Sequence, residues 1–96
     1  MSNPDLQKYT IVFSKSAKKF LDTLDKKNKQ RTLKKIRELQ SNNKNLDIKK
    51  LKSRYTLFRL RVGNFRVVYS IKHERVIIYI IAIGYRKDIY QHSNFA

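Results

Sequence analysis

The sequence predicts an α+β domain with the element order β-α-α-β-β-β, in which two N-terminal helices pack on one face of a mostly antiparallel, four-stranded sheet. Two observations indicate this class. Strand-like segments open the chain and fill its second half, and apolar residues recur at helical spacing between them. The 96 residues include two glycines, one proline and no linker-like stretch, so residues 1–96 are predicted to form a single domain.

The first strand and the first helix follow each other directly. Residues 8–13 are rich in β-branched and aromatic side chains, which favours a strand. Ser14 is then placed as the N-cap of a helix, because its hydroxyl can accept a hydrogen bond from a free backbone N–H. Four apolar residues at i, i+3, i+4 and i+7 give that helix its buried stripe: Ala17, Phe20, Leu21 and Leu24.

A second helix is predicted to begin after Asp25 or Asn28, either of which can serve as its cap. Its apolar face consists of Leu33, Ile36 and then Leu39 or Gln40, and it is expected to end near residues 41–43. Residues 42–54 form a polar connection, whose apolar side chains are expected to pack onto the core. These side chains are Leu46, Ile48 and Leu51.

From residue 57 onward the pattern indicates strands. Residues 58–62 alternate with period two, and Gly63-Asn64 predicts a two-residue hairpin turn, since glycine in the first turn position suits type II′. The chain returns over residues 65–71 and turns again at 72–75. Residues 76–83 are apolar on both faces, which predicts an interior strand that ends at Gly84.

The predicted hairpin register assigns a face to each of its side chains. Val62 is placed opposite Phe65 and Arg61 opposite Arg66, and paired residues share a face of the sheet. The apolar residues therefore face the helices, whereas Arg59, Arg61 and Arg66 lie on the other face. A solvated face is the simpler reading. Three guanidinium groups with no acid on either strand nevertheless favour an anion site, because the planar fork of arginine suits phosphate.

The composition points to a polyanionic partner. Lysine and arginine total 23 against 7 acids, a formal net charge of +16, which attracts RNA, DNA, an anionic membrane or an acidic protein. No long basic amphipathic helix argues for the membrane. The absence of cysteine excludes thiolate chemistry, and neither a metal ion nor a cofactor is expected. No signal peptide is recognised, so a cytoplasmic location is expected.

Two segments carry a resemblance to a known family. Residues 58–69, FRLRVGNFRVVY, resemble the hairpin "YRLRVGDYRVIY" of the RelE/ParE toxin superfamily. Residues 81–90, IAIGYRKDIY, are similar to its ending "IGHRKDVY", and residues 49–52 resemble the "kkLkg" that precedes the hairpin. The element order matches over nearly the whole chain, and the specific match covers residues 49–90.

The resemblance implies the toxin of a type II toxin–antitoxin pair, neutralised by an acidic antitoxin. RelE-type members enter the ribosomal A site and cut messenger RNA there without a metal ion. The resemblance places their catalytic positions on Arg61, Arg66, Arg86 and Tyr90. Because arginine stays protonated, Tyr90 is expected to act as the base on the RNA 2′-hydroxyl, with Arg66 and Arg86 stabilising charge on the phosphate.

Other residues are predicted to bind RNA around these positions. Tyr85 is expected either to stack on an unpaired base or simply to pack within the protein. The helix lysines are expected either to contact ribosomal RNA phosphates or to form a solvated surface. The full RNA-binding set is Arg59, Tyr85, Lys87, Lys52, Lys15, Lys18, Lys19, Lys34 and Lys35.

Three departures from the RelE-type pattern keep alternatives open. Arginines occupy second-strand positions that are often lysine, Tyr85 replaces a frequent histidine, and the C-terminal tail is short. One alternative is a ParE-like inhibitor of DNA gyrase without ribonuclease activity. Another is a weak or inactive member that binds RNA or regulates. The apolar second face of residues 76–83 is also expected to need a cover, which an antitoxin segment would supply.

Overall fold

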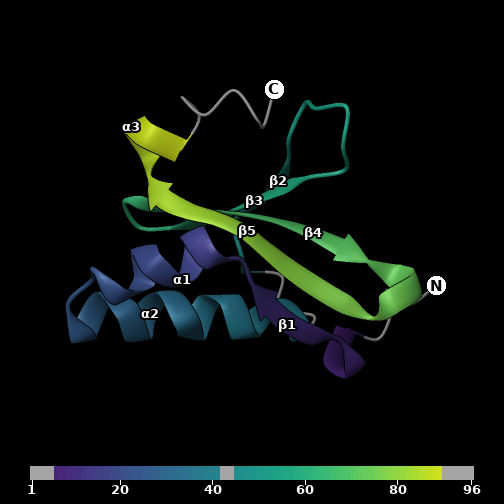
Figure 1. The fold of residues 1–96 in the computed structure, drawn as a ribbon, viewed down its shortest axis with the longest axis horizontal. Coiled ribbons are helices and arrows are strands. Elements are labelled where there is room, and N and C mark those ends of the chain that lie inside the picture. Colours follow the sequence, from purple (N-terminus) through teal and green to yellow (C-terminus); the bar gives the residue numbers. More distant parts are fainter. Residues whose placement is uncertain (1–5, 42–44, 90–96) are drawn as a thin grey trace.

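The computed structural model describes residues 6–41 and 45–89. Figure 1 shows two layers, with α1 and α2 against one face of a twisted sheet and α3 on the opposite side. The strands are ordered β1-β5-β4-β3-β2, and β1 is parallel to β5 while the other neighbours are antiparallel. The predicted α+β class is confirmed. The predicted number of four strands is wrong, because the sheet has five.

The N-terminal elements follow the sequence prediction closely. After η1 (Leu6–Lys8), β1 (Thr10–Phe13) leads into α1 (Lys15–Asp22). The hydroxyl of Ser14 accepts a hydrogen bond from the backbone N–H of Ala17 at 3.0 Å, which confirms Ser14 as the N-cap.

The second helix begins at the earlier of its two predicted caps. α2 (Lys26–Arg37) is capped by Asp25, whose carboxylate accepts from the backbone N–H of Asn28 at 3.3 Å. The amide side chain of Asn28 also donates to that carboxylate at 2.7 Å, and this hydrogen bond lowers the pKa of Asp25. The short η2 (Glu38–Gln40) continues α2 and ends at Ser41, near the predicted end.

The fifth strand, β2 (Ile48–Lys50), lies in the segment that was predicted as a connection. It pairs with β3 at the edge of the sheet and all three of its residues are exposed. Leu46 packs against the main core and Leu51 against a second cluster, as predicted. The prediction for Ile48 is wrong, since the edge position leaves this side chain 42% exposed.

The hairpin formed by β3 (Phe58–Val62) and β4 (Phe65–Lys72) has the predicted register, with Val62 opposite Phe65 and Arg61 opposite Arg66. Gly63 has φ +58°, whereas Asn64 has no positive φ, as a type II′ turn requires. We call this Gly63–Asn64 turn the hairpin tip.

The last strand is an interior one, as predicted. η3 (His73–Arg75) leads into β5 (Ile77–Tyr85), which lies between β1 and β4. α3 (Arg86–Ile89) follows without a break. No helix in the described part of the chain is long and apolar enough to cross a membrane.

Two apolar clusters hold the layers together. The main core lies between α1, α2 and the sheet, and its fully buried side chains include Ile36, Leu60 and Ile80. The second cluster lies on the opposite face, where Val68 of β4 packs with Leu57 and with Ile89 of α3. The second face of the sheet is therefore partly covered by the chain itself.

Candidate nucleic-acid interface

Two of the predicted catalytic arginines meet across the hairpin. Arg61 on β3 pairs with Arg66 on β4, and Arg66 in turn pairs with Gly84 on β5. Arg86 follows Gly84 by two residues at the start of α3. We refer to Arg61, Arg66 and Arg86 as the arginine row, which runs across three neighbouring elements close to the hairpin tip.

Arg66 is held by the backbone of the hairpin tip. Its Nη1 donates to the carbonyl oxygens of Gly63 and Phe65, each at 2.9 Å, and the residue is only 4% exposed. The sequence analysis placed Arg66 on the second face of the sheet, either solvated or as part of an anion site. In the structure its side chain folds back over the turn and is buried. Arg66 therefore supplies a fixed positive charge within the sheet surface.

Arg86 is tied to the hairpin tip through its backbone. Its N–H donates to the carbonyl oxygen of Asn64 at 3.1 Å, while its side chain is exposed. Gly84 allows α3 to pack closely, since a Cβ at this position would lie 3.3 Å from Cδ1 of Ile89. Tyr90, the predicted base, lies outside the described residues.

Arg59 and Arg61, both on β3, have an acidic partner that the sequence analysis did not predict. Asp47 Oδ1 lies 3.0 Å from Nη2 of Arg59, and Asp47 Oδ2 lies 3.9 Å from Nη1 of Arg61. The backbone carbonyl of Asp47 also accepts from the N–H of Arg61 at 2.9 Å. Asp47 precedes β2 rather than lying on the hairpin. As the only acid between Glu38 and Glu74, it was nevertheless recognisable in the sequence.

Tyr85 packs within the protein, as one of its two predicted roles requires, and also keeps an exposed surface. Its ring contacts Phe20 and Phe65, with centroid distances of 5.5 Å and 5.2 Å. The residue is still 48% exposed, so part of its ring remains open to solvent on the helix-facing side of the sheet. The side chain of Lys87, in α3, lies outside the described part.

The predicted lysines do not gather around the arginine row. α1 and α2 cover the face of the sheet opposite to Arg59 and Arg61, so their lysines form a separate basic surface (Figure 1). Lys35 is partly paired, at 3.9 Å from Glu38. The exposed members are Lys15, Lys18, Lys19 and Lys34 on the helices and Lys52 after β2.

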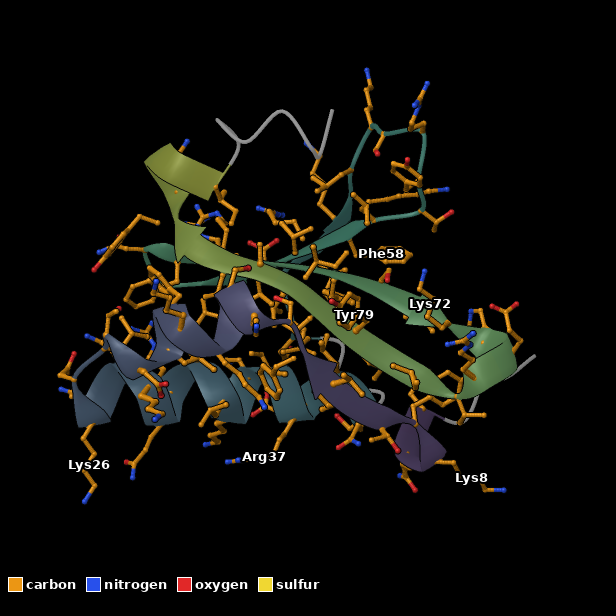
Figure 2. All side chains as sticks on the ribbon, in the orientation of Figure 1. Lys8, Lys26, Arg37, Phe58, Lys72 and Tyr79 are labelled. Atoms are coloured by element: carbon orange, nitrogen blue, oxygen red, sulfur yellow. The ribbon has the colours of Figure 1, made fainter. Side chains whose placement is uncertain are left out.

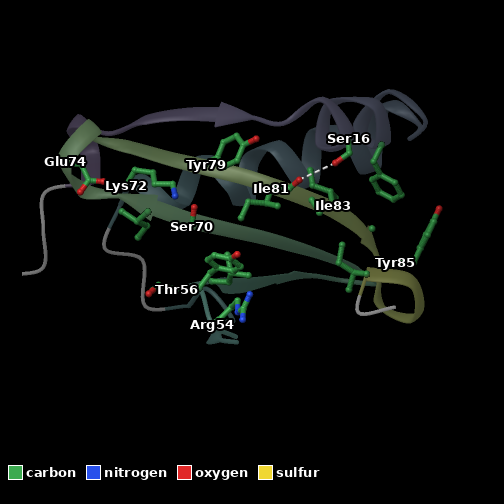
Figure 3. A pocket seen from close by; sticks show the side chains of 17 residues that line it. Ser16, Arg54, Thr56, Ser70, Lys72, Glu74, Tyr79, Ile81, Ile83 and Tyr85 are labelled. Carbon is green, nitrogen blue, oxygen red and sulfur yellow. Dashed lines mark hydrogen bonds between the residues drawn. The ribbon is translucent and has the colours of Figure 1, made fainter. Parts of the chain in front are cut away.

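A groove of about 1080 Å³ lies beside the second cluster (Figure 3). Its floor is largely apolar and includes Leu57, Tyr79 and Ile81. The hydroxyl of Ser70 is buried there without a hydrogen-bond partner, and Lys72 stands at the margin. Leu57 and α3 thus cover part of the apolar second face of β5, and the groove is the part that remains uncovered. Over residues 6–41 and 45–89, no three His, Cys, Asp or Glu side chains are placed to hold a metal ion.

Comparisons with known proteins agree with this architecture. A family profile described as the ParE toxin of the type II toxin–antitoxin system, parDE, matches residues 11–90. The RelB–RelE complex of Methanococcus jannaschii contains a chain that is 30% identical. The alignment covers 85% of this chain and 98% of that one, with a TM-score of 0.69. A comparison with curated proteins finds no match.

Two further solved structures share the fold. The RelE–RelB complex of Pyrococcus horikoshii matches at 27% identity and TM-score 0.72, covering 84% of this chain and 98% of the other. The isolated RelE toxin of E. coli matches at 22% identity and TM-score 0.65, over 90% and 95% of the two chains. The fold and the matches define a toxin of a type II toxin–antitoxin system. The chain belongs to the ParE toxin family, within the RelE/ParE superfamily.

Proposed function

We propose that the chain is a ribosome-dependent, metal-independent endoribonuclease, which inhibits translation by cleaving messenger RNA in the A site. The observation that carries the proposal is the convergence on the hairpin tip. The guanidinium of Arg66 donates to Gly63 O at 2.9 Å, the backbone N–H of Arg86 donates to Asn64 O at 3.1 Å, and Arg61 is the strand partner of Arg66. Arginine residues from three separate elements thereby start from the same end of the sheet, an arrangement that suits the binding of a phosphodiester.

The proposed reaction needs only side chains of the protein, the RNA and a proton from solvent. Tyr90 accepts the proton of the 2′-hydroxyl, and the 2′-oxygen attacks the adjacent phosphorus. The bond from phosphorus to the 5′-oxygen breaks, and that oxygen takes up a proton from solvent. The products are a 2′,3′-cyclic phosphate and a 5′-hydroxyl. Arg61 and Arg86 bind the phosphate oxygens, and the fixed charge of Arg66 stabilises the negative charge of the transition state.

The surrounding residues are proposed to hold the RNA strand. Arg59, Lys52 and Lys87 contact phosphates next to the scissile one, and the exposed surface of Tyr85 stacks on an unpaired base. The separate lysine surface on α1 and α2 contacts ribosomal RNA, so that the scissile phosphate and the ribosome bind to different faces of the domain.

The proposed partner is an acidic antitoxin in the same cytoplasmic compartment. The relatives from Methanococcus jannaschii and Pyrococcus horikoshii are toxin–antitoxin complexes. The groove on the second face supplies apolar surface at Tyr79 and Ile81 with Lys72 at its margin, which suits an amphipathic segment bearing carboxylates. A chain of net charge +16 also favours an acidic partner.

Cell-free translation with mapping of messenger-RNA 5′ ends tests the ribonuclease proposal. The wild-type chain is expected to produce new 5′ ends at A-site codons, and Arg86→Ala and Tyr90→Phe are expected to reduce them strongly. Intact messenger in the presence of the folded wild-type chain would rule the proposal out.

Inhibition of DNA gyrase is the second candidate, and the match to the ParE family profile favours it. It requires binding without RNA cleavage, since the superfamily fold serves more than one activity. Arrested supercoiling with intact messenger RNA supports this candidate over the first. A supercoiling assay run beside the translation assay therefore separates the two.

A further inference from the structure

Arg31 of α2 reaches the hairpin tip from the helix layer. A Cβ built on Gly63 would lie 3.0 Å from Nη2, 3.1 Å from Nη1 and 3.2 Å from Cζ of Arg31. The guanidinium therefore lies directly against Gly63, in space that is open only because this residue has no side chain. A residue of the second helix is thus in contact with the turn that anchors the arginine row.

The same glycine is contacted by two guanidinium groups from different elements. Arg66 donates to its carbonyl oxygen at 2.9 Å, while Arg31 lies against its Cα side. The next carbonyl, that of Asn64, accepts from the N–H of Arg86 at 3.1 Å. The tip therefore gathers arginines from α2, from β4 and from the start of α3.

The charge of Arg31 is not neutralised within the described residues. None of the ion pairs found there includes Arg31. The acids of the helix layer pair with other residues, Asp22 with Lys29 and Glu38 with Lys35. Lys27 and Lys35 lie one helical turn away on either side, and like charges at this spacing destabilise a helix. Arg31 is also exposed, so its guanidinium is open to an external anion.

We infer that Arg31 is a further RNA-binding residue, which holds the phosphate next to the one at the arginine row and leads the strand over the hairpin tip onto α2. The inference rests on the proposed ribonuclease function. It extends the binding surface from the second face of the sheet, around Gly63, to the helix layer. Arg31 binds substrate without touching the scissile bond, so its loss raises KM and leaves kcat nearly unchanged.

The test measures binding of a short, mixed-sequence, single-stranded RNA with 2′-O-methyl sugars, which cannot be cleaved by 2′-hydroxyl attack. Arg31→Gln is expected to weaken binding about fivefold at a tenth-molar salt and to lower the slope of log K against log salt by about 0.7. Arg31→Lys keeps the charge and is expected to restore most of the slope.

Arg37→Gln is the matched control, because it removes the same charge from the same helix. Figure 2 shows Arg37 pointing away from the sheet, as Lys26 does at the other end of α2. This variant is expected to change affinity by less than about twofold. Thermal unfolding of each variant shows whether Arg31 only braces the tip, since such a role lowers Tm without changing the salt slope.

The outcomes separate the inference from the proposed function. Equal effects of Arg31→Gln and Arg37→Gln, or an unchanged slope, overturn the inference while A-site cleavage by the wild type stands. If the wild-type chain neither binds nor cleaves RNA, the proposed function fails and this inference fails with it.

Discussion

The guanidinium of Arg59 donates from Nη2 to Oδ1 of Asp47 at 3.0 Å, which joins the second face of β3 to the chain just before β2. Arg59 retains 15% of its side-chain exposure, and its Nε is buried without a partner. Asp47 thus places a carboxylate where the proposed function places RNA phosphates. Asp47 both positions the guanidinium of Arg59 and competes with RNA phosphates for binding to it.

Asp47→Asn is expected to tighten RNA binding. The change raises the formal net charge from +16 to +17 and releases Arg59 and Arg61 from a competing anion. We expect affinity for single-stranded RNA to rise about twofold to fivefold at low salt, and unfolding free energy to fall by less than about 1 kcal/mol. Asp22→Asn makes the same charge change on α1 and is expected to alter RNA affinity less. Equal gains in both variants would show that only net charge matters.

Gly63→Ala is expected to destabilise the fold in two separable ways. The φ of +58° costs about 1–2 kcal/mol for a residue with a Cβ, and that Cβ would approach Arg31 Nη2 to 3.0 Å. In Gly63→Ala combined with Arg31→Ala only the backbone cost remains. Denaturant unfolding of both single variants and the double variant measures the coupling. If the losses of unfolding free energy in the two single variants add up to the loss in the double variant, the Cβ at position 63 does not clash with Arg31.

The hairpin could be predicted from sequence because its determinants are local. A two-residue turn and strict alternation leave one register that buries Leu60 and Val67 together, and that register is the observed one. The helix caps could be predicted for the same reason, because each cap bonds to a backbone N–H only three residues further on. Ser14 caps α1 and Asp25 caps α2.

The missed features depend on residues far apart in the chain. β2 is a three-residue edge strand that is defined only by its pairing with β3, and no periodicity in its sequence indicates it. Arg31 meets Gly63 only once α2 has packed on the sheet. The inward turn of Arg66 depends on two carbonyls at the tip, a choice of rotamer that alternation cannot specify.

Arg86→Ala is expected to abolish toxicity while leaving the fold intact. The contact to Asn64 uses the backbone N–H of Arg86, which alanine retains, and the lost side chain is exposed. Growth arrest on induction measures toxicity, and Tm of the purified variant is expected to stay within about 2 °C of wild type. Full toxicity in a folded Arg86→Ala variant would exclude the role proposed for this side chain.

Lys72→Glu is expected to weaken binding of the acidic antitoxin, because it reverses a charge at the margin of the apolar groove (Figure 3). Titration calorimetry with the proposed acidic antitoxin would show a dissociation constant raised severalfold, and the increase would shrink at high salt, as expected for a charge at an interface rim. Lys26→Glu makes the same change at the start of α2, away from the groove, and is expected to have a much smaller effect. Equal losses would place the antitoxin elsewhere.

Tyr69 is expected to make the fold sensitive to alkali. The residue is 3% exposed in the main core, and burial raises the pKa of Tyr69 from 10.0 to about 12. Below pH 10 the phenol is neutral in both the folded and the unfolded chain, so the stabilisation is complete. Between about pH 10 and 12 the unfolded chain loses this proton first, so the free energy of unfolding falls as pH rises, by up to about 2–3 kcal/mol. Tyr69→Phe lacks the ionisable hydroxyl and is therefore the reference that isolates the contribution of the tyrosine. If wild type and Tyr69→Phe lose stability in parallel from pH 9 to 12, the phenol of Tyr69 ionises in the folded state as readily as in the unfolded chain.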